Sequence, residues 1–292
     1  MAYVDEEIAS QPASWRRAVD LAGEAAGALP RPGERVAVVG CGTSWFMAMA
    51  YAGLREAAGL GETDAFAGSE FPLNRAYDRI VAITRSGTTT EVLDLIAATS
   101  IPTTAIIGDP DSPAVTAADE TVLLPWADEK SVVQTRFATS ALALFRAHLG
   151  EDLSGAIADA EQTVTAELPL DPTATEQVTF VGRGWTVGLA QEAALKCREA
   201  AAFWTEAYPA MDFRHGPISI SAPGRAVWAF GEVPAGLDAD VARTGATFVN
   251  ASGRDPMADL ILAQRFAVAL ARHKGLDPDT PRNLTRSVIL EP

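Results

Sequence analysis

The sequence predicts an α/β protein made of two tandem domains, each a parallel β-sheet covered by helices on both faces. Short apolar runs rich in β-branched residues alternate with helical stretches, which is typical of a buried parallel sheet. The apolar run and glycine turn of residues 36–42, VAVVGCG, has a counterpart in VTFVGRG at 178–184, so the plan is used twice. A length of 292 residues leaves room for two domains that each bury a core.

The first half is expected to begin with an amphipathic helix at 4–29, with Pro12 as the point where it would break. Alternation of apolar runs and helical patterns then places the remaining elements. We expect strands at 35–40, 64–67, 79–84, 102–107 and 120–124, and helices from 43 or 44 to about 58, at about 89–99 and at 131–149.

The second half follows a turn-rich linker at 167–172, ELPLDP. Strands are expected at 178–182, 226–230 and 246–250, with helices opening by Glu192 and spanning 257–273. We therefore divide the chain into an N-terminal helix, a first domain, a second domain and a polar C-terminal tail, with the respective ranges 1–30, 31–166, 167–275 and 276–292.

Composition and charge exclude several functional classes. The formal net charge is −15 and no basic run occurs, which argues against nucleic acid or an acidic membrane as partner. An anionic substrate would have to be held by backbone dipoles and hydroxyls.

No apolar run reaches bilayer length, and the N-terminus MAYVDEEIASQP lacks the apolar core of a signal peptide, so we expect a cytoplasmic protein. Its two cysteines lie in separate halves and form no metal-ligand cluster, and we expect no metal.

Residues 192–217 carry the chemistry best suited to proton transfer. Glu192, Lys196 and Glu199 are spaced i, i+4 and i+7 and share one helical face. His215 follows in a His-Gly-Pro turn. A carboxylate, an amine and an imidazole suit proton transfer next to a carbonyl. The alternative is a solvated helix with an ion pair and a turn histidine.

A hydroxyl-rich turn at 84–91, TRSGTTTE, follows an expected strand and opens a helix. Hydroxyls and free N–H groups at a helix N-terminus can cradle a phosphate without net positive charge. The alternative is an N-cap cluster in which Ser86 or Thr88 caps the helix and Glu91 completes a capping box. Thr43 or Ser44 could likewise cap the helix that follows the first strand.

The Gly-x-Gly turns after residues 39 and 181 could instead announce a dinucleotide-binding fold. Trp45 and Val187 occupy the places where the third glycine of that fingerprint is needed. We therefore disfavour a dinucleotide cofactor.

Six motifs together resemble the double SIS (sugar isomerase) family. They are ALKxxE at 194–199, HGP at 215–217, the SxSGxT signature at 84–89, CGTS at 41–44, the ExSVAxT loop at 129–135, and PRNLTRSV at 281–288, similar to PRNLAKSV in the family. The resemblance implies two tandem three-layer α/β/α SIS (flavodoxin-like) domains with parallel sheets, and a C-terminal tail that closes the active site.

The resemblance also implies roles for individual residues. Glu199 becomes the base acting between C1 and C2 of the sugar, His215 the ring-opening histidine that enters the neighbouring subunit's site of a homodimer, and Lys196 a further catalytic residue. The substrate and its phosphate are expected to contact Thr43, Ser44, Thr84, Arg85, Ser86, Thr89, Val132 and Arg286.

Two departures from the family pattern matter. Arg286 replaces a lysine, and because a guanidinium stays protonated it cannot form an imine, although it can bind an anionic or hydroxylated substrate. Arg85 beside the first signature hydroxyl could add a cation to the pocket. Met1 is not followed by a nucleophilic cysteine and no glutaminase domain is present, so we expect no glutamine amidotransferase activity from this chain.

The resemblance thus implies a phosphosugar aldose–ketose isomerase, or a deaminase (deglycase) of amino-sugar or ketosamine phosphates, without metal or organic cofactor. The expected partners are a small-molecule sugar phosphate and a second copy of the chain. The alternative is a non-catalytic SIS module that binds a sugar phosphate and regulates a partner. Retention of Glu199 and His215 favours the enzyme.

Overall fold

The structure is a computed structural model that describes residues 2–290 and separates them into two compact units. Unit 1 contains the chain up to Ala9, Ser131–Val133 and Ser154–Leu284. Unit 2 contains Ser10–Lys130, Gln134–Leu153 and the chain from Thr285 onward.

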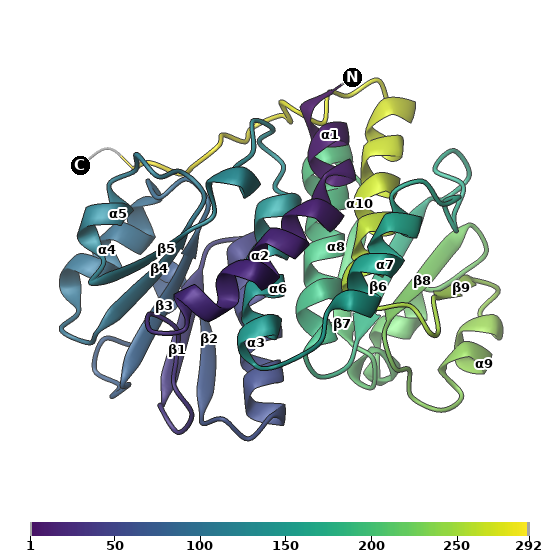
Figure 1. Cartoon of the computed structure of the whole chain (residues 1–292). Helices are drawn as coiled ribbons and strands as arrows, with labels where there is room; N and C mark the ends of the chain where they lie inside the picture. Colours follow the sequence, from purple (N-terminus) through teal and green to yellow (C-terminus); the bar gives the residue numbers. More distant parts are fainter. Residues whose placement is uncertain (1, 291–292) are drawn as a thin grey trace. The chain divides into compact units, whose positions relative to one another are not determined.

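Unit 2 is built on a five-stranded parallel sheet in the order β2-β1-β3-β4-β5. Val38 of β1 lies opposite Ala65 of β2 and Val81 of β3. In Figure 1, α4 and α5 lie on one side of this sheet and α2, α3 and α6 on the other. The elements are α2 (Gln11–Ala25), β1 (Val36–Gly40), α3 (Thr43–Ala57), β2 (Thr63–Ala67), β3 (Arg79–Thr84), α4 (Thr90–Ala98), β4 (Thr103–Ile107), α5 (Ala114–Ala117), β5 (Glu120–Leu123) and α6 (Arg136–His148).

Unit 1 repeats the plan with a four-stranded parallel sheet in the order β7-β6-β8-β9. Phe180 of β6 lies opposite Ala207 of β7 and Trp228 of β8. The elements are α1 (Tyr3–Ala9), α7 (Ser154–Thr163), β6 (Gln177–Gly182), α8 (Thr186–Ala201), β7 (Thr205–Pro209), β8 (Arg225–Phe230), α9 (Leu237–Ala242), β9 (Thr247–Asn250) and α10 (Pro256–His273). The predicted α/β fold class with two parallel sheets is confirmed.

The borders of the two units differ from the four predicted segments. Helix α1 precedes the strands of the first sheet in the sequence, and α7 follows them. Both helices pack against α10 and therefore belong to unit 1. The tail is likewise divided after Leu284. Contacts between residues far apart in sequence decide these borders, and local composition does not reveal them.

Several element predictions are corrected. The helix expected at 4–29 is two helices separated at Ser10, and Pro12 lies in the first turn of α2, where a missing N–H costs nothing. Helix α6 begins at Arg136 and not at 131. Elements α5, α7, β7 and α9 were not predicted.

A glycine ends the first strand of each sheet because the next helix begins directly over it. A Cβ on Gly40 would lie 2.6 Å from the backbone carbon of Ser44, and one on Gly182 would lie 2.3 Å from the backbone oxygen of Thr186. Both strands are fully buried. The repeated VxxVGxG pattern therefore reflects the same close approach of helix to strand in both units.

No helix within residues 2–290 is long and apolar enough to span a bilayer.

Candidate active site

The strand order of unit 2 marks one place on the sheet edge as a candidate ligand site. The chain leaves β1 toward β2 on one side and then returns to β3 on the other, so the connections diverge between β1 and β3. In open α/β sheets a crevice forms at such a switch point, at the carboxyl ends of the strands. Thr43 and Ser44 follow β1, and the turn that begins at Thr84 follows β3. The hydroxyl-bearing residues of both motifs therefore lie at this edge of the sheet.

The turn after β3 is held by its own hydroxyls and not by a capping box. Thr84 Oγ1 accepts the Gly87 N–H at 3.2 Å, and Ser86 Oγ accepts the Thr88 N–H at 3.3 Å and the Thr88 hydroxyl at 3.0 Å. The N-cap of α4 is Thr89, without a side-chain capping bond. The alternative in which Ser86 or Thr88 caps the helix is therefore wrong. The first N–H groups of α4 have backbone acceptors instead: that of Thr90 donates to Val288 O and that of Val92 to Thr89 O.

The loop after β1 shows the same feature. Gly42, with a positive φ of 55°, is the N-cap of α3, and this helix has no side-chain capping bond. The expectation that Thr43 or Ser44 caps it is wrong. Both residues lie in the first turn and are only 3% exposed.

The tail occupies part of this edge within unit 2. The Thr90 N–H donates to Val288 O at 3.2 Å, the Leu290 N–H donates to Thr90 Oγ1 at 2.9 Å, and the hydroxyls of Thr89 and Ser287 lie 3.3 Å apart. Sequence reasoning did not name Ser287 and Thr90 as site residues, although they lie within the motifs at 281–288 and 84–91.

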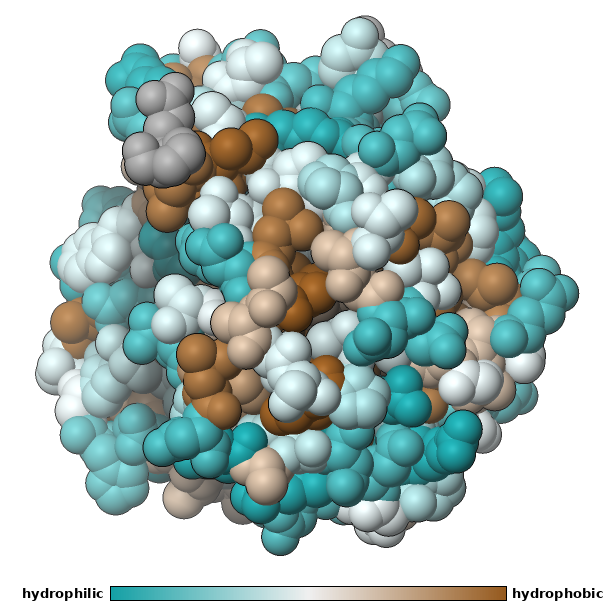
Figure 2. Space-filling model, turned by 90° about the vertical axis from the view of Figure 1, so that its left-hand side faces the viewer, coloured by the Kyte–Doolittle hydropathy of each residue, from teal (hydrophilic) through white to brown (hydrophobic). Residues whose placement is uncertain are grey.

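The tail is held by polar bonds and not by burial of its side chains. Val288, Ile289 and Leu290 are 53%, 66% and 59% exposed. Figure 2 views this side of the molecule and shows brown hydrophobic patches among predominantly hydrophilic surface. Breaking a few hydrogen bonds would therefore release the segment.

Arg286 fastens the tail to unit 2. Its Nη2 donates to both carboxylate oxygens of Asp128, at 2.7 and 2.8 Å, and its Nη1 donates to the Glu129 carbonyl. Asp109 lies farther away, at 3.8 Å. The guanidinium is thus engaged with unit 2 itself.

Arg85 lies beneath this contact. Its side chain is 1% exposed, its Nη2 donates to the Arg286 carbonyl at 2.9 Å, and its Nη1 lies 4.0 Å from Glu129 Oε2. The side chain is directed at Glu129 and the tail, so the sugar-binding role expected for Arg85 remains a prediction that needs its own test.

Glu129 sets the start of α6. One of its oxygens accepts the Thr135 N–H at 2.6 Å, the Thr135 hydroxyl at 2.7 Å and the Arg136 N–H at 2.9 Å. A carboxylate at this position satisfies donors that the helix leaves free and favours the positive end of its dipole. This capping explains why the helix does not begin at 131.

Val132 belongs to unit 1, where its N–H donates to Asp279 O at 3.0 Å. Asp279 also accepts the N–H groups of Tyr3 and Val4 at 2.7 and 2.8 Å. The predicted substrate-binding loop is thus anchored by the tail segment that caps α1.

Helix α8 brings the predicted acid–base group of unit 1 together. Lys196 Nζ lies 3.4 Å from Glu192 Oε1 and 2.5 Å from Glu199 Oε2. The side chains of Glu192 and Lys196 are 0% and 1% exposed, whereas that of Glu199 is 21% exposed. Two carboxylates share one ammonium, and Glu199 is the member of the group that remains accessible.

A cavity of about 690 Å³ borders Glu199 within unit 1. One wall is a face of α8 with Leu195, Arg198 and Glu199, together with the C-cap Ala202. The other wall is formed by residues 275–277 and 280–284. Small-molecule sites commonly have volumes of roughly 300–1,000 Å³. The carboxylate therefore lies on the wall of a cavity large enough for a sugar.

His215 is not brought to this cavity in unit 1. It ends a short 3₁₀ turn, Asp212–His215, and is exposed, while Phe213 beside it is fully buried. The buried phenyl ring anchors the turn and leaves the imidazole on the surface. Within the described residues, no group of three or more histidine, cysteine, aspartate or glutamate side chains could hold a metal ion.

The switch point of unit 1 differs in chemistry from that of unit 2. Thr186 Oγ1 donates to Phe230 O at 3.0 Å, and Arg183 and Glu232 form an exposed ion pair at 3.4 Å. No hydroxyl-rich turn follows β6 or β8. The two sheets share a plan, but only unit 2 carries the hydroxyl-rich turn that is predicted to bind phosphate.

Comparison with known proteins finds relatives among the glutamine–fructose-6-phosphate aminotransferases. No family model matches the chain. The glutamine–fructose-6-phosphate aminotransferase (isomerizing) of Gloeobacter violaceus is 28% identical over 323 residues, covering 88% of this chain and 52% of the relative. That of Bacillus subtilis is 25% identical over 350 residues, covering 99% of this chain and 58% of the relative. The chain spans about half the length of the curated relatives it matches.

Solved structures share the fold over the full length. Glucosamine-6-phosphate deaminase from Thermotoga maritima has a TM-score of 0.83 at 23% identity, covering 99% of this chain and 100% of that one. Tagatose-6-phosphate ketose/aldose isomerase from Escherichia coli has a TM-score of 0.80 at 19% identity, covering 100% and 97%. At these identities the likeness establishes the fold.

Proposed function

Proceeding from the resemblance of this chain to the double SIS (sugar isomerase) family, we propose that the protein is a phosphosugar isomerase or deaminase. Such an enzyme moves a proton between C1 and C2 of a sugar phosphate. The observation that carries the proposal is Glu199: an accessible carboxylate on a cavity wall, held by a buried lysine. The deaminase and isomerase that share the fold agree with this reaction class.

The phosphate would be held in unit 2. Its oxygens would accept hydrogen bonds from the hydroxyls of Thr43, Ser44, Ser86 and Thr89. The Thr90 N–H, which donates to Val288 O of the tail, would join them when the tail is displaced. Such a site needs little net positive charge, which suits a chain of charge −15. Thr84 shapes the turn through its bond to Gly87.

Proton transfer would be the work of α8. Glu199 removes the proton from C2 of an open-chain aldose, an enediol forms, and the same carboxyl returns the proton to C1 while the hydroxyl proton moves to the former carbonyl oxygen. In the reverse direction C1 loses the proton and C2 gains it. Lys196 holds Glu199 in place through its 2.5 Å bond, and the buried Glu192 orients Lys196 from the other side.

Two further roles belong to the same proposal. His215 would open the sugar ring in the site of a second subunit, because its surface position lies away from the Glu199 cavity of its own unit. Arg286 would hold the tail and contribute no imine, so amine transfer by that route is not part of this mechanism. An enzyme of this kind is expected in the cytoplasm and without glutamine amidotransferase activity.

The test is hydrogen exchange at carbon. The chain is incubated in D₂O with fructose 6-phosphate, glucosamine 6-phosphate, tagatose 6-phosphate and fructosamine 6-phosphate in turn, and NMR follows deuterium entering C1 or C2. Exchange with one of these sugars supports the proposal, because exchange reports proton transfer whichever way the net reaction runs. Binding of a sugar phosphate without exchange of any would instead indicate the regulatory module.

A further inference from the structure

A second cavity in unit 1, of about 420 Å³, lies apart from the residues that border Glu199. Its walls come from α1, α10 and the end of α7 with the loop after it. Along α10 the lining residues are Arg265, Val268, Ala269 and Arg272, spaced i, i+3, i+4 and i+7, so one face of that helix forms the floor.

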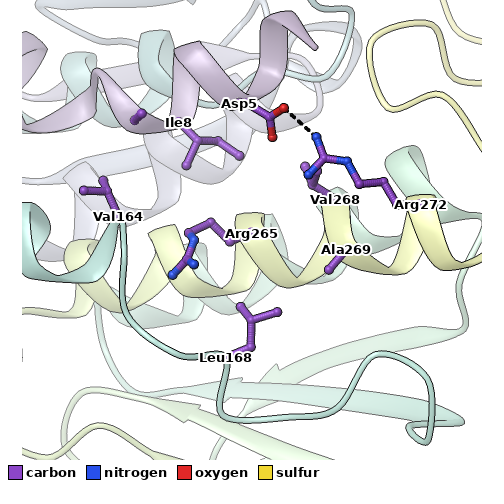
Figure 3. A pocket seen from close by; sticks show the side chains of 9 residues that line it. Asp5, Ile8, Val164, Leu168, Arg265, Val268, Ala269 and Arg272 are labelled. Atoms are coloured by element: carbon purple, nitrogen blue, oxygen red, sulfur yellow. Dashed lines mark hydrogen bonds and ion pairs between the residues drawn. The ribbon is translucent and has the colours of Figure 1, made fainter. Parts of the chain in front are cut away.

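The lining combines two cations, one anion and apolar walls. Arg272 Nη2 donates to Asp5 Oδ2 at 2.5 Å, which pairs one cation with the only acid of the lining. Figure 3 shows the Arg265 guanidinium lying among Ile8, Val164 and Leu168. With Asp5, Arg265 and Arg272 ionised, the lining carries one net positive charge.

Arg265 is the charge without an anionic partner among the described residues. Its Nη1 donates to the carbonyls of Thr163 and Ala166, at 2.8 and 2.6 Å, at the C-terminal end of α7. Carbonyl dipoles stabilise a guanidinium but do not neutralise it. Burial lowers the pKa of the Arg265 side chain from its ordinary value, because partial removal from water disfavours the charged form.

The remaining donors of Arg265 are open to this space. Neither its Nε nor its Nη2 is among the buried polar atoms without a partner in the described chain, and no bond to another residue uses them. A planar guanidinium presents such N–H groups in a fork that matches a carboxylate. The apolar side chains around it would cover the body of the same molecule.

We propose that this cavity is a binding site for a small monocarboxylate with an apolar body, seated by its carboxylate on Arg265 and covered by Ile8, Val164 and Leu168. The single net charge of the lining favours a monoanion. Asp5 disfavours a second negative charge at the other end of the cavity.

The full chain is titrated calorimetrically with 3-phenylpropionate and hexanoate, and with the uncharged amide of each. We expect both acids to bind and both amides to bind roughly 10- to 100-fold more weakly, the range for losing a hydrogen bond to a charged group. Equal affinity of acid and amide would overturn the proposal. So would absence of binding by both acids up to about 10 mM.

Three variants locate the site. Ala269→Leu narrows the cavity from α10 while leaving the Arg265 bonds to α7 intact, and should abolish acid binding. Arg265→Met keeps the apolar stem, removes the charge, and should bring the acids to the affinity of the amides. Arg243→Met removes an exposed unit 1 arginine that does not line the cavity and should bind like the parent.

Arg265→Met also removes the hydrogen bonds from Arg265 to the carbonyls of Thr163 and Ala166 and could destabilise unit 1. Ala269→Leu keeps these bonds, so it still tests the site if Arg265→Met does not fold. Acid binding that persists in Ala269→Leu places the carboxylate elsewhere and refutes the site. A crystal structure with 3-phenylpropionate should show its carboxylate on Arg265 Nη2. This experiment tests the site without relying on the proposed sugar chemistry.

Discussion

Replacing Asp128 by asparagine should loosen the tail from unit 2. The substitution keeps the shape of the side chain and removes the negative charge that holds Arg286 through two contacts of 2.7 and 2.8 Å. Hydrogen bonds between charged groups contribute about 1.5–3 kcal/mol, and fully exposed ion pairs about 0–1 kcal/mol. The Arg286 and Asp128 side chains are 35% and 29% exposed, so the pair lies between these limits. We expect a loss of about 1–2 kcal/mol, or a roughly 5- to 30-fold larger population of the released tail.

Trypsin cleavage after Arg286 measures that population. When opening and closing are faster than cleavage, the cleavage rate follows the fraction of open tail. The rate after Arg286 should therefore rise roughly 5- to 30-fold in Asp128→Asn. Arg282, exposed and in unit 1, provides an internal reference whose cleavage should not change.

Asp109→Asn is the matched control, because Asp109 faces the same guanidinium from 3.8 Å and its loss should change the rate by less than about threefold. Equal acceleration in both variants would show that general charge, and not the Asp128 contact, holds the tail. No acceleration in Asp128→Asn would refute the role given to Arg286.

Four further predictions concern the site and the stability of unit 1. Glu199→Gln should lower turnover by about 10²–10⁴ with sugar-phosphate affinity within a few-fold, because the amide keeps the shape but takes no proton; near-parental turnover would move the base elsewhere. Ser86→Ala and Thr89→Ala should each weaken the binding of phosphorylated ligands by about 1–3 kcal/mol in calorimetry and leave the binding of unphosphorylated analogues nearly unchanged. Equal loss of affinity for both kinds of ligand would show that the turn is purely structural. Mixing Glu199→Gln with His215→Ala subunits should restore up to about half the parental activity per heterodimer, because one of its two sites then has both residues intact; demonstrated exchange without activity would place His215 in its own subunit's site or outside any. Burial raises the pKa of the Asp259 carboxyl from 3.8 to about 6, so its stability contribution is fully present below pH 3.8 and is lost as the pH rises through about 6. Asp259→Asn should therefore raise the free energy of unfolding at pH 7 by roughly 1–3 kcal/mol and make that free energy less dependent on pH between 3.8 and 6. Denaturant titrations that show the same pH dependence in the variant as in the parent would contradict this.

Much of the fold could be predicted because its signals are local. Apolar β-branched runs predicted strands at 35–40, 79–84 and 178–182, and the structure has them at 36–40, 79–84 and 177–182. Strands buried on both faces favour such continuous apolar runs. Helix α8 is Ala- and Leu-rich, and its i, i+3 and i+4 spacings predicted that Lys196 would lie beside Glu192 and Glu199. Neither result depends on residues distant in the sequence.

The short edge strand β7 and the start of α6 could not be predicted in this way. The sequence of β7, TEAYP, has weak strand character and pairs because β6 lies beside it. The sequence pattern from 131 to 135 predicted the beginning of a helix. The Glu129 carboxylate accepts the N–H groups of Thr135 and Arg136, so α6 begins at Arg136.

The sequence by itself determined which chemical groups this protein has to offer: the hydroxyl turn after β3, the acid–base face of α8 and the histidine turn. Motif and helical period suffice for these, because each is made of neighbours along the chain. Only the tertiary structure decided what the groups contact. Arg286 pairs with Asp128 across 158 residues of sequence. Arg265 has no carboxylate partner among residues 2–290, and the walls of its cavity come from α1, α10 and the end of α7. Ion pairing and burial depend on distances through space, and those are set when the chain packs.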